Sequence, residues 1–169
     1  PLIRYHYGHR MEMFDAHSYN KGGLILHMLR KYLGDDVFFK GLSYYLRKNE
    51  YSDVEVHELR LAFEEVSGKD LNWFFDQWFF NPGHPEIIVQ DTFNNGKLTV
   101  LVDQIQDVTY QDSLGFRSNA VYSFPVKISY YIGQRKFEEM VYVNGLKNEF
   151  VFDIDRKPDL VIFDDQQVL

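Results

Sequence analysis

In the first half of the chain, apolar residues recur three and four positions apart, the spacing that places them on one face of a helix. Caps and helix-ending residues divide this half into four predicted helices. The first runs from about Ser18 to a left-handed cap at Gly34. Asp35 or Asp36 is predicted to cap the second helix, which Asn49 ends.

The third predicted helix opens with a capping box, in which the side chains of Ser52 and Glu55 each accept from a free backbone N–H. Gly68 ends it. Asp70 is predicted to cap a fourth helix over residues 71–80, which Pro82 and Gly83 stop. The fourth helix is apolar on most sides, so it must be buried, and its tryptophans, Trp73 and Trp78, are assigned to the core.

The second half of the chain changes to the alternation of apolar and polar residues that is typical of strands. The predicted strands are residues 86–93, 97–106, 120–132, 135–143, 149–154 and 160–164. Asn95 and Gly96 supply the positive φ angles of a tight hairpin turn between the first two. Residues 107–119 carry no clear pattern and are predicted to be a loop.

These patterns predict an α+β chain in which an N-terminal helical segment of about four helices is followed by a mainly antiparallel β-sandwich. The change of period falls near His84, which gives predicted domains of residues 1–84 and 85–169. The second domain carries most of the net negative charge.

Composition narrows the choice of partners. The 169 residues include 18 Lys and Arg against 25 Asp and Glu, a net charge of −7, which argues against binding nucleic acid or an anionic membrane. No apolar run approaches the roughly 20 residues of a membrane-spanning helix. The chain has no cysteine, so it offers no thiolate zinc site and no disulfide, and its compartment stays open.

Three histidines near the N-terminus, His6, His9 and His17, lie close in sequence to Glu12 and Asp15 and are residue types that bind zinc. We do not assign a metal site to them, because the segment has no helical stripe that would bring such ligands together. Asp15 and His17 would line the same cleft as the following helix, or Asp15 would cap that helix. The chain contains no His-Glu-x-x-His, nucleophile-elbow, phosphate-loop or dinucleotide motif.

Three separated motifs resemble the M1 family of zinc aminopeptidases, gluzincins related to aminopeptidase N and leukotriene A4 hydrolase. The first motif is Tyr19-x-Lys21-Gly22, at the start of the first predicted helix. The others, in the same order as in the family, are Phe38-Phe39-x-Gly41-Leu42 and Phe75-x-x-Trp78 with Gly83-His84-Pro85. Many members of the family place a small β-sandwich after the last motif.

The resemblance implies a zinc-dependent peptidase that removes N-terminal residues from peptides, and it implies a role for one residue of this chain, Tyr19. The Tyr19 hydroxyl would donate a hydrogen bond to the oxyanion of the tetrahedral intermediate, opposite the zinc ion. A neutral phenol suits that role because it keeps its proton at pH 7. Lys21 is interpreted as solvated or locally paired, and Gly22 and Gly23 as positions of close approach by another backbone or a substrate.

The zinc ligands and the general base that the family places before the tyrosine motif are absent from this sequence. We therefore expect a fragment: the C-terminal part of a thermolysin-like catalytic domain joined to the sandwich, separated from the N-terminal catalytic half. Such a fragment is expected to bind no catalytic zinc, to be inactive alone, and to self-associate through apolar surface that the missing half would cover.

Two alternatives stay open at this stage. A non-catalytic scaffold or interaction module could retain the peptidase fold without its zinc site. A free-standing sandwich that binds carbohydrate or peptide is disfavoured, because it would not explain the peptidase motifs in the helices.

Overall fold

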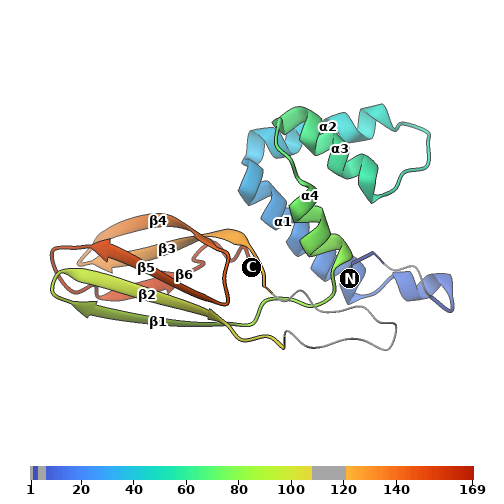
Figure 1. Ribbon diagram of the computed structural model, residues 1–169. Coiled ribbons are helices and arrows are strands. Elements are labelled where there is room, and N and C mark those ends of the chain that lie inside the picture. Colours follow the sequence, from blue (N-terminus) through green and yellow to red (C-terminus); the bar gives the residue numbers. More distant parts are fainter. Residues whose placement is uncertain (1, 4–6, 108–120) are drawn as a thin grey trace. The chain divides into compact units, whose positions relative to one another are not determined.

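The computed structural model describes residues 2–3, 7–107 and 121–169. The chain divides into two compact units, Pro1–Pro82 and Gly83–Leu169. The first is helical and the second is built of strands, so the chain is α+β as predicted (Figure 1). The predicted loop over residues 107–119 lies almost wholly outside the described residues. In the part of the chain that is described, no helix has the length and apolar character needed to cross a bilayer.

The helical unit opens with a 3-10 helix, Arg10–Met13, and a π-helical turn, His17–Lys21. Four α-helices follow within its described residues: α1 (Gly22–Leu33), α2 (Asp35–Lys48), α3 (Val56–Ser67) and the short α4 (Asn72–Phe75). A second π-helical turn, Asp76–Phe80, continues α4. The four predicted helices are therefore confirmed, with π-helical turns at the start of the first and the end of the fourth.

Two predictions for the junction between α1 and α2 are wrong: the cap of α2 and the left-handed conformation of Gly34. Neither Asp35 nor Asp36 caps α2: the N-cap is Gly34, whose carbonyl accepts from Phe38 N at 3.0 Å, and Asp35 instead pairs with Arg30. Gly34 has the positive φ expected of it (82°), but its ψ of 156° lies outside the left-handed helical region. The glycine thus ends α1 and starts α2, so no separate capping residue is required.

The capping box of α3 lies three residues later than predicted. Glu55 is the N-cap and its N–H donates to Glu58 Oε2 at 2.9 Å, whereas the Ser52 hydroxyl donates to the Asn49 carbonyl. Gly68 ends α3 in the left-handed conformation, as predicted. The N-cap of α4 is Leu71, so the predicted cap at Asp70 is wrong by one residue, although the Asp70 carboxylate does accept from Asn72 N at 2.8 Å.

Helices α2 and α3 pack at the unusually close approach that Gly41 allows. The Phe63 ring is fully buried and stacks on Phe38 at a centroid distance of 5.3 Å. A Cβ added at Gly41 would lie 2.5 Å from Phe63 Cδ1 and 2.8 Å from Cε1, closer than real Cβ contacts. Because the ring is enclosed, it has little room to give way.

The second unit contains six described strands, close to those predicted: β1 (Ile87–Asn94), β2 (Lys97–Gln104), β3 (Phe124–Ile132), β4 (Arg135–Val143), β5 (Lys147–Asp153) and β6 (Leu160–Phe163). In the described residues they form two antiparallel three-stranded sheets, ordered β1-β2-β5 and β4-β3-β6. The β1–β2 hairpin pairs Asn94 with Lys97, and Asn95 and Gly96 both have positive φ, as predicted.

Alternating residues of the two central strands form the core of this unit. The buried side chains are Leu98, Val100 and Val102 of β2 and Phe124, Val126, Ile128 and Tyr130 of β3. Tyr130 of one sheet stacks with Phe152 of the other at a centroid distance of 6.1 Å. The sheets therefore bury facing apolar surfaces, as in a sandwich.

A buried amide connects the end of β2 to two other segments. Gln104 Nε2 donates to the carbonyls of Tyr122 and Gly145 at 2.8 and 3.0 Å, and its Oε1 accepts from Tyr122 N at 2.9 Å. Gln106 Nε2 also donates to Gln104 Oε1, at 3.0 Å. Burial raises the pKa of Tyr122 to about 12. A satisfied buried amide of this kind favours a single arrangement of the segments it joins.

A cluster of charged residues links β4 to the segment after β6. Lys136 Nζ lies 2.5 Å from Asp165 Oδ2 and 2.7 Å from Glu138 Oε1, and the buried Ser129 hydroxyl donates to Asp165 at 2.7 Å. The Lys136 hydrogen bond holds the pKa of the Asp165 carboxyl below its usual range, and the Lys136 and Lys127 hydrogen bonds do the same for Glu138.

Substituting Gly41 with alanine should destabilise the helical unit by about 1–3 kcal/mol, because the new methyl group overpacks Phe63. The check is urea unfolding of the full chain, followed by the fluorescence of Trp73 and Trp78, which both lie in this unit. Gly23→Ala in α1 is the matched control, since its Cβ would meet nothing within 4 Å. Gly23→Ala should raise the free energy of unfolding by about 0.5–1 kcal/mol. Equal destabilisation by the two substitutions would contradict the packing argument for Gly41.

Acid should weaken the strand unit through Asp165. A carboxyl with a lowered folded-state pKa contributes stability above its unfolded pKa, near 4, and loses it as the pH falls through the folded value. Asp165→Asn should therefore be less stable than wild type at pH 7, and the difference should shrink as the pH falls below about 4. Urea unfolding followed by far-UV circular dichroism at several pH values checks this. Asp153→Asn, at an exposed position 3.8 Å from Lys97, is the control: its free energy of unfolding should change with pH as that of wild type does.

Candidate functional site

The predicted site residue, Tyr19, lies in the π-helical turn that precedes α1. Its N–H donates to the Asp15 carbonyl at 3.1 Å, and its side chain is 65% exposed. The ring lies 6.4 Å from the Phe14 ring, tilted by 35°. Turns of π-helix are uncommon and occur frequently at functional sites. The turn thus presents a phenol hydroxyl on the surface of the helical unit.

Asp15 and Ser18 fix the backbone of this turn. Asp15 Oδ1 accepts from Ser18 N at 3.0 Å, and the Ser18 hydroxyl donates to the Met13 carbonyl. Of the two predictions for Asp15, the structure supports the capping one. The neighbouring His17 was predicted to line the same cleft, and its side chain lies outside the described residues.

Lys21 is the last residue of the turn and is partly buried. Burial lowers the pKa of the Lys21 ammonium, since desolvation disfavours its charged form. Gly22 beside it is buried. Gly23 is exposed, and among the described residues nothing lies within 4 Å of its Cβ position, so no other backbone of this part of the chain approaches it.

The polar residues of the N-terminal segment make local backbone contacts. His9 Nδ1 accepts from Met11 N at 3.2 Å, and Glu12 Oε2 accepts from Gly8 N at 2.9 Å. His6 lies outside the described residues. The described part of the chain contains no group of three or more His, Cys, Asp or Glu residues that could hold a metal ion.

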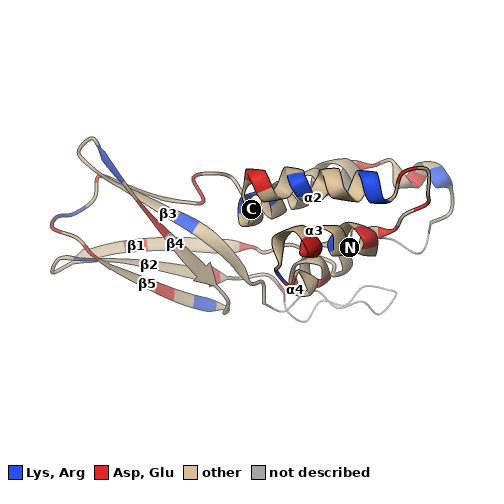
Figure 2. Cartoon of the chain, turned by 90° about the horizontal axis from the view of Figure 1, so that it is seen from above, with Lys and Arg blue, Asp and Glu red and all other residues tan. Residues whose placement is uncertain are grey.

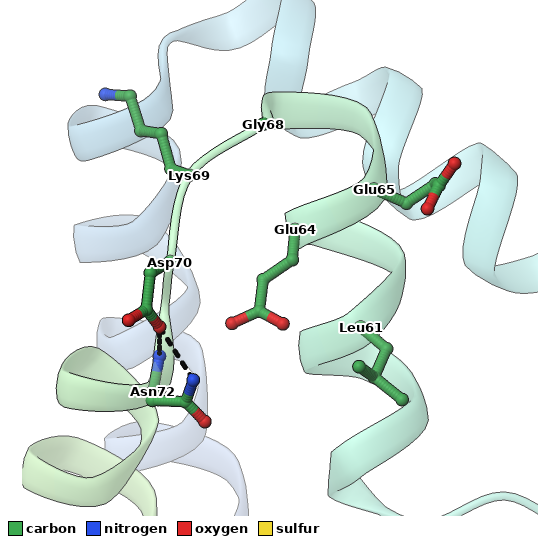
Figure 3. Close-up of a pocket in the computed structure, with 7 residues that line it drawn as sticks. All are labelled: Leu61, Glu64, Glu65, Gly68, Lys69, Asp70 and Asn72. Carbon is green, nitrogen blue, oxygen red and sulfur yellow. Dashed lines mark hydrogen bonds between the residues drawn. The ribbon is translucent and has the colours of Figure 1, made fainter.

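A surface hollow of about 440 Å3 lies at the turn between α3 and α4. Its lining residues are Leu61, Glu64, Glu65, Gly68, Lys69, Asp70 and Asn72. Figure 3 shows the Glu64 side chain directed toward the turn at Asp70 and Asn72, while Glu65 and Lys69 point away. The Glu64 carboxylate accepts from Leu71 N at 2.9 Å and pairs with Arg60 at 2.7 Å. These contacts hold the α3–α4 junction together, which is a structural role.

Charge does not single out another site. Acidic and basic residues are interspersed along α2 and along the strands (Figure 2). Several of the cations lie over aromatic rings: Lys69 Nζ is 4.4 Å from the centroid of the Tyr32 ring, and the Arg30 guanidinium is 5.1 Å from that of Phe39. Arg30 also pairs with Asp35 at 2.7 Å. Such pairs stabilise the surface of the helical unit.

The sequence did not predict three features of this region: the π-helical turn, the Ser18–Met13 hydrogen bond and the hollow beside Asp70. The turn and the hydrogen bond depend on the exact path of the backbone, for which residue type gives no signal. The hollow depends on the angle between two helices. The cap at Asp15 could be predicted from the sequence, because an aspartate side chain often accepts from the backbone N–H three residues later at the start of a helix.

Comparisons with known proteins show which family the helical unit resembles. Residues 5–78 match the model of the peptidase family M1 domain. Aminopeptidase N of Lactococcus lactis subsp. lactis is 43% identical over 84 residues, which cover 47% of this chain and 10% of that protein. Tricorn protease-interacting factor F2 of Thermoplasma acidophilum is 33% identical over 141 residues, covering 79% of this chain and 17% of that protein.

The fold is also shared with a solved structure. Legionella pneumophila aminopeptidase A, in complex with aspartic acid, matches 93% of this chain and 18% of its own chain, with a TM-score of 0.74 and 20% sequence identity. The helical unit of this chain belongs to peptidase family M1, and the predicted family relationship is confirmed. The chain spans only 10 to 18% of the length of these relatives.

The N-terminal segment exposes several large apolar side chains. Those more than half exposed in residues 7–24 are Tyr7, Met11, Phe14, Tyr19 and Leu24. We expect the 169-residue chain to self-associate through them, which sedimentation velocity at increasing concentration would detect. The double variant Met11→Ser, Phe14→Ser should shift the chain toward monomer, whereas Leu46→Ser at an exposed position of α2 should not. A wild-type chain that stays monomeric would contradict this expectation.

Proposed function

We propose that this chain is part of a zinc-dependent aminopeptidase and that Tyr19 is its oxyanion-stabilising residue. One observation carries the proposal: in a unit that belongs to peptidase family M1, the tyrosine of the Tyr-x-Lys-Gly motif presents an exposed side chain from a π-helical turn. A core tyrosine would instead bury its ring. The exposed hydroxyl is available to a substrate.

The chemistry assigned to Tyr19 is hydrogen-bond donation. When a water attacks the scissile carbonyl, negative charge develops on the carbonyl oxygen, and a donor already aimed at that position stabilises the transition state more than the ground state. A neutral phenol donates without changing its protonation state. Tyr19 would therefore lower the barrier without acting as an acid or a base.

The zinc that the family relationship implies does not fit the residues of this chain. The sequence has no His-Glu-x-x-His motif, and the described residues offer no group of three ligands. Zinc in such enzymes activates the attacking water and polarises the carbonyl. Its ligands would belong to a part of the protein outside this sequence, and we assign no step through the metal to residues of this chain.

We assign the two units to successive domains: residues 1–84 to the C-terminal part of the catalytic domain and residues 85–169 to the β-sandwich that follows it. The family match lies within the first unit, while the relative from Thermoplasma acidophilum matches over 79% of the chain. Relatives of this chain are named aminopeptidases, so the substrates we propose are peptides with a free N-terminus.

The test compares wild type with Tyr19→Phe in the longer protein that we propose contains this chain. Loss of one oxyanion donor should reduce kcat for an aminoacyl-fluorophore by about 100-fold or more, with zinc content unchanged. The measurements are steady-state hydrolysis and metal analysis of the purified protein. Tyr51→Phe, at a fully exposed tyrosine in the α2–α3 loop, is the control and should retain wild-type kcat.

Two outcomes would contradict the proposal in different ways. An active Tyr19→Phe protein with unchanged kcat would remove the role of Tyr19. A wild-type protein without zinc and without activity would support the alternative of a scaffold or interaction module that retains the peptidase fold.

A further inference from the structure

The direction of the Tyr19 side chain depends on the backbone of its turn, because few side chains pack around the ring. Tyr19 is exposed, and its ring contact is with Phe14, which is itself 63% exposed. Packing therefore does little to fix the direction of the phenol ring. The backbone of the turn, residues 17–21, must fix that direction.

Asp15 provides two of the hydrogen bonds that hold this backbone. Its carboxylate Oδ1 accepts from Ser18 N at 3.0 Å, and its carbonyl accepts from Tyr19 N at 3.1 Å. The Ser18 hydroxyl, within the same turn, donates to the Met13 carbonyl. The residue immediately before Tyr19 and Tyr19 itself are thus both tied to Asp15.

The structure assigns Asp15 as a positioning residue for Tyr19: its carboxylate caps Ser18 and so keeps the π-helical turn in the geometry that directs the phenol hydroxyl outward. This inference rests on the proposed function of Tyr19. A π-helical turn holds one more residue than an α-helical turn, and one residue rotates the side-chain direction by about 100°. Loss of the cap would release Ser18 N, let the path of the turn shift and swing the hydroxyl away.

The carboxylate is needed here for its oxygen and not for its charge. Ser18 N is a backbone donor, and an amide oxygen accepts from it as well as a carboxylate oxygen does, which is why Asn and Asp are equivalent caps. Asp15→Asn should therefore preserve the turn, whereas Asp15→Ala should not. A role based on negative charge would predict equal loss in both variants.

The experiment uses the same longer protein and measures kcat and KM separately. Asp15→Ala should lower kcat by at least about 10-fold, since small misplacements of a catalytic group cost up to about 100-fold, and should leave KM within about twofold. Asp15→Asn should restore kcat to within about threefold of wild type. If Asp15→Ala does not fold, Asp15→Gly, which removes the same oxygen and is the milder change at a cap, replaces it.

A matched control separates positioning from loss of stability. The Asp70 carboxylate makes a comparable bond just before α4, accepting from Asn72 N at 2.8 Å, and it lies outside the proposed site. Asp70→Ala should lower the melting temperature and leave kcat unchanged. If Asp70→Ala lowers kcat as much as Asp15→Ala does, the effect is general destabilisation and the assignment of Asp15 is overturned.

Combining the substitutions tests whether Asp15 acts through Tyr19. In the Tyr19→Phe background, Asp15→Ala should change kcat by less than about twofold, because a positioning residue has no effect once the group it positions is gone. Multiplicative losses would overturn the inference and leave the role of Tyr19 intact. If Tyr19→Phe alone has wild-type kcat, the proposed function of Tyr19 fails first and the inference fails with it.

Discussion

The segment over residues 71–80 must be buried, and the helical unit is organised around that constraint. Its buried side chains are Leu71, Phe74, Phe75, Trp78 and Phe79. Each of the neighbouring segments contacts it: Tyr32 of α1 meets Trp73 edge-on at 5.5 Å, and His57 of α3 stacks on Phe80 at 5.3 Å. The N-terminal residues Leu2 and Ile3 donate to the Phe79 carbonyl. Burying these aromatic rings removes a large apolar area from water, which stabilises the unit.

The candidate site lies in the π-helical turn directly before α1, whose own buried residues belong to the core of the helical unit. Ile25, Met28 and Leu29 form the buried stripe of α1. Tyr19 and Leu24 are exposed and lie close to the start of the helix. A helix anchored by its buried stripe thus follows directly after the proposed catalytic residue. Such placement on a supported element suits catalysis, where a donor must keep its position without reorganising during the reaction.

The sequence predicted the elements well because their signals are strong and local. Helical stripes and strand alternation placed four helices and six strands, and Asn95-Gly96 and Gly68 marked turns that only a few residue types accommodate. The caps of α2 and α3 were predicted wrongly, since several neighbouring residues could serve and tertiary pairing decides among them. Asp35, for example, pairs with Arg30, which leaves Gly34 as the N-cap.

The sequence predicted which residue forms the candidate site but not the backbone geometry around it. The motif pointed to Tyr19, yet nothing in residue type predicted that its turn would be π-helical, because α- and π-helical turns differ by a single residue in their hydrogen-bond spacing. Individual hydrogen bonds, of about 1 kcal/mol each, contribute to the choice between the two turns. Buried aromatic side chains thus stabilise the helical unit, while local hydrogen bonds at Asp15 and Ser18 hold the turn that carries Tyr19.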